Sequence, residues 1–151
     1  MATKEYLAVG VAAAAITVLA GCGGGSSPAD PAPAALKPVP GSVVKQVNLT
    51  QQAMHRLGIA TRQVQAAAVA QSGQRRMHKV IPYSAVVYDT DGSTWTFVNT
   101  ETRTFVRQPI TVDAIDGTTA VLDRGPAVGA AVVTVGAPEL LGAEYEISGE
   151  E

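Results

Sequence analysis

The chain has 151 residues, of which 46% are hydrophobic and 16% charged, and its formal net charge is −2. A single cysteine excludes an internal disulfide. One tryptophan, two phenylalanines and four tyrosines are too few for the aromatic platforms on which nucleic-acid bases stack, so we expect no nucleic-acid partner. Length and composition together predict one small domain.

Residues 1–21 have the pattern of a lipoprotein signal peptide. Lys4 supplies a positive charge before the apolar run at residues 7–20. This run is too short, and too rich in Ala and Gly, for a good membrane-spanning helix. The junction "LAGC" resembles a bacterial lipobox, in which the cysteine is acylated and becomes the new N-terminus. We therefore predict an exported protein that is lipid-anchored through Cys22 to the cell envelope, on the periplasmic or extracytoplasmic side.

Residues 22–42 predict a flexible linker between the acylated cysteine and the domain. This segment is rich in Gly, Ser, Pro and Ala, and such a composition buries too little apolar surface to order itself. The predicted domain then covers residues 43–148.

Charge is unevenly distributed along the chain. Residues 31–88 contain seven basic residues and no acid, whereas residues 89–151 contain eleven acids and three bases. Either the two halves interleave in one fold and neutralise each other, or the basic half forms a face near anionic lipid headgroups.

The first elements of the domain are a short strand at residues 43–47 and a helix at residues 51–57. Thr50 can cap the free amides of the first helical turn, and Gly58 can end the helix in the left-handed conformation. An alternating pattern over residues 59–69 then predicts a strand.

After a turn predicted at residues 71–76, short strands and turns follow to the end of the domain. The predicted strands cover residues 77–81, 84–89, 94–99, 104–113, 118–122 and 131–135. The pairs Asp91-Gly92 and Asp116-Gly117 can supply the positive φ angles of tight hairpins, and Pro109 interrupts its strand. The pattern predicts an all-β fold, a small antiparallel β-barrel or sandwich with one short helix.

Residues 80–144 resemble the C-terminal membrane-proximal and β-barrel region of periplasmic adaptor subunits, the membrane fusion proteins of HlyD- and RND-type efflux systems. The similarity lies in "IPYSAV", the "DG" hairpin, "TFVRQPITV", a second "DG", "VVTVGAPEL" and "LGAE". "VNLTQQAMHRLGIATRQV" at residues 47–64 is also similar to the segment with which many such adaptors begin.

Two parts that such adaptors usually contain are missing from this chain. The family places a lipoyl-like domain, and often a long α-helical hairpin, between the first and last strand sets, whereas here residues 69 and 77 are joined by one turn. The resemblance therefore implies a minimal adaptor or accessory component of an efflux or export complex. Its partners would be an inner-membrane transporter, a full-length adaptor subunit, or both.

A contact function places its determinants on loops and strand edges. The hairpin tip, the edge near Pro109 and the turn after residue 122 are the candidate surfaces. The charged residues there, which we expect to be exposed and to orient a partner, are Asp89, Asp91, Arg107, Asp123 and Arg124.

No catalytic residue or cofactor is predicted, because no Ser, His and Asp or Glu set has a spacing that indicates catalysis. The chain is therefore not expected to be an enzyme. Two Met-His pairs, Met54-His55 and Met77-His78, carry soft ligands that suit copper or silver, although two pairs distant in sequence form a weak motif and no metal is expected. The alternative function is a metal- or small-ligand-binding envelope lipoprotein.

Overall fold

The computed structural model describes residues 32–71 and 73–145, which all lie in one compact unit. The predicted signal peptide, Cys22 and the first part of the predicted linker lie outside these residues. No helix among the described residues is long and apolar enough to cross a membrane.

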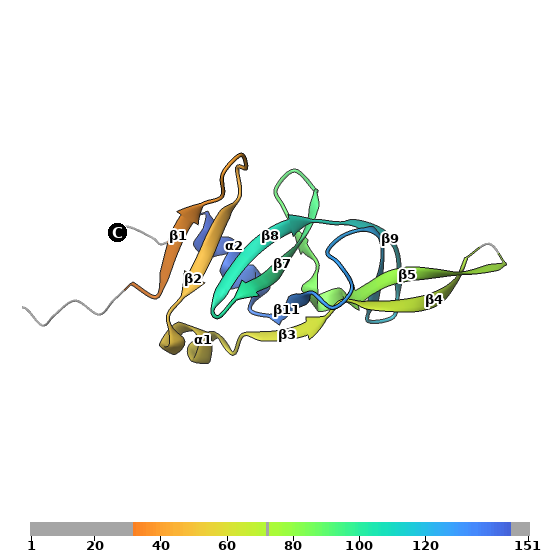
Figure 1. The fold of residues 1–151 in the computed structure, drawn as a ribbon, viewed down its shortest axis with the longest axis horizontal. Coiled ribbons are helices and arrows are strands. Elements are labelled where there is room, and N and C mark those ends of the chain that lie inside the picture. The colour runs from red at the N-terminus through yellow and green to blue at the C-terminus, as the bar shows by residue number, and fades with distance from the viewer. Residues whose placement is uncertain (1–31, 72, 146–151) are drawn as a thin grey trace, which may run out of the picture. The chain divides into compact units, whose positions relative to one another are not determined.

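The fold is all-β and its strands pair antiparallel in two sheets, which confirms the predicted class (Figure 1). The first sheet has the order β1 (Ala34–Pro38), β2 (Lys45–Leu49), β8 (Thr104–Pro109), β7 (Thr94–Glu101), β11 (Ala131–Val135) and β3 (Ala60–Gln63), with β6 (Val87–Tyr88) also on β7. The second has the order β4 (Gln65–Gln71), β5 (Gln74–Pro82), β10 (Thr119–Arg124) and β9 (Thr111–Asp116). Within the described residues neither sheet closes, so the barrel alternative is wrong.

The first helix, α1 (Gln51–Leu57), forms as its caps predict. The Thr50 hydroxyl accepts a hydrogen bond from the Ala53 amide at 3.1 Å. Gly58 has φ of 60°, and its N–H donates to carbonyls of the last turn. Because both ends of this helix are satisfied locally, its boundaries could be read from a few neighbouring residues.

A second short helix, α2 (Ala137–Glu144), was not among the predicted elements. It follows Gly136, whose φ is 87°, and it carries Pro138 and Glu139 in its first turn. Proline and an acid at a helix start are favourable signals that could have identified it. A single 3-10 turn, η1 (Tyr83–Ala85), also interrupts the predicted strand at residues 84–89.

Strand β1 lies within the segment that the sequence predicts as a linker. It pairs antiparallel with β2 in the register Ala34 with Leu49 and Leu36 with Val47. Both Ala34 and Leu36 pack against the first core described below. Pairing with β2 satisfies backbone groups that this composition could not satisfy alone, so the ordered domain begins before residue 43.

Each face of the first sheet carries its own hydrophobic core. Phe97 and Val98 are neighbours on β7, and their side chains enter opposite faces. Phe97 joins a core that α2 covers through Leu140, and Val98 joins a core shared with Ile81 of the second sheet. Burying each such side chain stabilises the fold by about 1.5–3 kcal/mol.

The predicted breaks and turns among the later strands are confirmed. The single strand predicted over residues 104–113 is instead two strands in different sheets, β8 and β9. They separate at residue 110, directly after Pro109, where the sequence predicted an interruption. Gly92 and Gly117 have φ angles of 82° and 57°, as the two Asp-Gly pairs require.

Candidate functional site

The five residues predicted to contact a partner do not share one environment. Asp91, Asp123 and Arg124 are exposed, whereas Asp89 is half-buried. The Arg107 side chain is only 4% exposed, so the expectation that it lies on an exposed edge is wrong. Arg107 and Phe105 are two residues apart on β8 and so share a face of the strand. Phe105 lies in the core that also contains Leu140 of α2.

Arg107 is the centre of a buried charge cluster. Its Nη1 forms an ion pair with Asp89 Oδ2 and donates to the Tyr145 hydroxyl at 3.2 Å. Its Nε lies 3.0 Å from Glu144 Oε2. The guanidinium carbon also stacks 4.4 Å from the centre of the Trp95 ring, a cation–π geometry.

Three parts of the chain that are distant in sequence meet at this cluster. The loop before β7 supplies Asp89, β8 supplies Arg107, and the end of α2 supplies Glu144 and Tyr145. Glu144 also accepts the Lys45 amide of β2 at 3.1 Å. The cluster therefore joins α2 to the first sheet, and its members are engaged with one another.

The pKa shifts of Asp89 and Tyr145 in the charge cluster both lead away from neutral pH. Hydrogen bonds from the Tyr145 hydroxyl and the Thr90 amide, together with Arg107, lower the pKa of Asp89 to about 2. The bond to Asp89 raises the pKa of Tyr145. Burial alone would lower the pKa of Arg107, but Asp89 and Glu144 raise it overall. These shifts favour a structural role for the cluster.

The two Met-His pairs lie on α1 and on β5, which Figure 1 shows at opposite ends of the described fold. Met54 packs against the first core, and His55 is exposed. Met77 is 67% exposed, while His78 is half-buried. One ion therefore cannot be held by both pairs of a single chain, and no group of three or more His, Cys, Asp or Glu residues gathers in the described residues.

A hairpin of β4 and β5 extends beyond the second sheet (Figure 1). Only residues 79–82 of β5 pair with β10, so residues 74–78 pair with β4 alone. The sequence prediction of a turn over residues 71–76 is wrong here, because Arg75 and Arg76 belong to β5. We call β4 and residues 74–78 of β5 the basic arm.

The basic arm combines cations with an unblocked strand edge. Arg75 and Arg76 are exposed, as is Met77, and the arm contains no acid. Strand β4 reads QAAAVAQ, without charge or proline, and in the described residues its outer edge has no partner strand. Natural edge strands are usually blocked by charge, proline or a bulge, so this edge is open to another chain.

The sequence predictions did not include the basic arm or the partners of Arg107. The available signal for the arm was the pair Arg75-Arg76 close to the run of small residues in QAAAVAQ. The Ser-Gly pair between them favoured a turn instead. Glu144 and Tyr145 could not be assigned to Arg107 because α2 was not predicted.

Comparison of the chain with protein-family models, curated proteins and solved structures found no match. The likeness to adaptor subunits therefore rests on the sequence segments quoted above.

Proposed function

We propose that this protein is a lipid-anchored envelope protein that acts through protein–protein contact, as a minimal adaptor or accessory component of an efflux or export complex. The basic arm is its contact element. The observation that carries this proposal is the unblocked edge of β4 beside Arg75 and Arg76.

The chemistry of the basic arm defines the partner it fits. An open strand edge offers backbone donors and acceptors to an added strand, which supplies affinity without a deep pocket. Arg75 and Arg76 favour an acidic surface, and such charges increase the encounter rate and orient the partner. The partner is thus a protein with a free strand edge and acidic neighbours, in a transporter or a full-length adaptor.

In-cell photo-crosslinking tests this function. A photoreactive amino acid at Ala68, which is exposed on the arm, should capture an inner-membrane transporter or full-length adaptor, identified by mass spectrometry. The same amino acid at Thr102, which is exposed in the turn between β7 and β8, is the matched control and should capture far less.

Charge reversal on the arm sharpens the experiment. Arg75→Glu with Arg76→Glu should lower the crosslink yield from Ala68 several-fold, because both charges would repel an acidic surface. Arg56→Glu with Arg103→Glu changes the net charge equally at exposed sites away from the arm and should leave the yield unchanged. Equal capture from Ala68 and Thr102, or no transport component from a well-expressed protein, would reject the proposal.

A further inference from the structure

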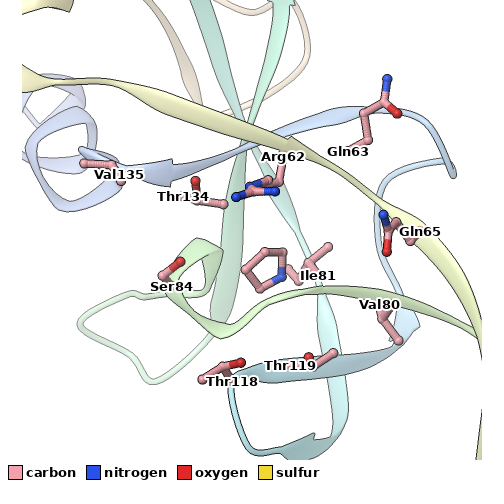
Figure 2. Close-up of a pocket in the computed structure, with 11 residues that line it drawn as sticks. Arg62, Gln63, Gln65, Val80, Ile81, Ser84, Thr118, Thr119, Thr134 and Val135 are labelled. Atoms are coloured by element: carbon pink, nitrogen blue, oxygen red, sulfur yellow. The ribbon is translucent and has the colours of Figure 1, made fainter.

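A cavity of about 410 Å³ lies between the two sheets at the base of the basic arm. Its lining residues, drawn in Figure 2, come from β3, β5 and β11, from the starts of β4 and β10, and from η1 and the turn before β10. Pro82 and the accessible edge of Val80 provide apolar surface, while Ser84 and Thr118 bring hydroxyl groups. Its volume lies in the range of about 300–1,000 Å³ typical of small-molecule sites.

Arg62 supplies the cation of this cavity. It pairs opposite Val132, so both side chains lie on the same face of the first sheet, and Val132 is fully buried in the second core. Figure 2 shows the Arg62 guanidinium beside Thr134, on the cavity side of β3. The sheet therefore places this cation beside the cavity, where Arg62 is also exposed to solvent.

The charge of Arg62 has no internal counterpart. Among the described residues no acidic side chain lines the cavity, and the Arg62 guanidinium has no ion pair or hydrogen bond there. Arg62 is exposed, so water and an incoming ligand can reach it, whereas Arg107 is buried between two carboxylates. A guanidinium fork matches the two oxygens of a carboxylate, and such charge-assisted pairs are stronger than neutral ones.

We propose that this cavity binds a small organic acid, with its carboxylate on Arg62 and its apolar body against Pro82 and the accessible edge of Val80. A single guanidinium balances one carboxylate charge. The apolar surface distinguishes this ligand class from an inorganic anion. The inference rests on the cavity alone and does not depend on the basic arm.

Benzoate is a suitable probe, and benzamide is its neutral isostere. With the ¹⁵N-labelled full-length chain in neutral detergent, benzoate should shift the backbone amides of Thr118, Thr119 and Thr134 saturably. Benzamide should bind at least about tenfold more weakly, because it cannot form the charge-assisted pair. Binding of both probes with equal affinity would overturn the role of the anion.

Variants separate the cavity from non-specific anion binding. Arg62→Gln should weaken benzoate by at least about tenfold, whereas Arg56→Gln, at an exposed position on α1, should bind as the wild type does. Arg62→Lys keeps the positive charge but lacks the guanidinium fork, so its affinity for benzoate should lie between those of Arg62→Gln and the wild type. Unchanged amide shifts elsewhere in the Arg62→Gln spectrum would show that the variant is folded.

Three results would overturn the proposal. The first is the absence of any saturable benzoate shift up to the solubility limit. The second is wild-type affinity in the Arg62→Gln variant. The third is tighter binding of inorganic phosphate than of benzoate, which would show that the apolar surface contributes nothing.

Discussion

Arg107 shows how much a single buried charge depends on its surroundings. Removing a guanidinium from water costs several kcal/mol, and this cost is offset only when carboxylates and hydrogen bonds replace the water. Here Asp89, Glu144, Tyr145 and the Trp95 ring replace it together. Loss of Arg107 would remove the cation that pairs with Asp89 and Glu144.

Replacing Arg107 should therefore destabilise the fold strongly. Arg107→Met would leave Glu144, whose side chain is 2% exposed, as an uncompensated buried charge, and we expect a loss of about 3–5 kcal/mol in the free energy of unfolding. Urea denaturation followed by circular dichroism measures this loss. Arg124→Met, at an exposed position, should change stability by less than about 0.5 kcal/mol. Equal effects of the two substitutions would refute the structural role of the cluster.

Asp89 should make stability depend on pH in the acid range. Its pKa of about 2 in the folded chain lies below the ordinary value of 3.8, so the folded state favours the ionised form. This contribution is fully present above the ordinary pKa and is lost as the pH falls from about 4 through about 2. Asp89→Asn lacks it, so the stability difference between wild type and variant should shrink in that interval. Parallel urea midpoints for the two proteins from neutral to acidic pH would contradict this account.

At the scale of elements, a glycine with positive φ marks one end of each helix. Gly58 ends α1 with open space around the position of a Cβ atom. Gly136 precedes α2, and a Cβ atom there would overlap Cδ1 of Ile59. The two positions thus need glycine for different reasons, backbone conformation alone at Gly58 and conformation plus packing at Gly136.

Three alanine substitutions separate these contributions. Gly58→Ala should cost about 1–2 kcal/mol, which is the cost of a left-handed residue with a side chain. Gly136→Ala should cost more, because Ile59 must also move. Gly142→Ala, inside α2 with open space, should instead stabilise the fold by about 0.5–1 kcal/mol. The order of the three melting temperatures is the measurement, and a Gly136→Ala variant as stable as Gly58→Ala would show that Ile59 does not limit this turn.

At the scale of the whole molecule, the proposed function joins an anchor to a contact element. The basic arm extends from the second sheet, while α2 packs against the first sheet and the charge cluster links the two. An anchor would restrict the arm to partners in the same envelope, which raises their effective concentration.

The anchor makes a separate prediction. Cys22→Ser removes the only cysteine, so fatty-acid labelling should be lost and the protein should leave the membrane fraction. An acylated cysteine with more than one chain supplies stable attachment, which one chain alone does not. The matched control is Ser26→Ala in the same segment, which should label as the wild type does. Labelling that persists in Cys22→Ser would exclude the lipoprotein assignment.

The features that the sequence determined by itself are local. Thr50 and Gly58 bound α1 through contacts within one turn, and Asp91-Gly92 forms its hairpin through the φ angle of Gly92. Pro109 ends β8 because it lacks an amide hydrogen. Each of these signals acts over a few residues, so no knowledge of the remaining fold is needed to interpret it.

The tertiary structure decided everything that depends on distant partners. The strand at residues 34–38 exists because β2 pairs with it, and its own composition favours a linker. Arg107 is buried because α2 brings Glu144 and Tyr145 over β8. The cavity beside Arg62 likewise requires strands from both sheets. Strand pairing, burial and cavity formation all depend on contacts between segments far apart in the chain. Such contacts leave no pattern within a short stretch of sequence.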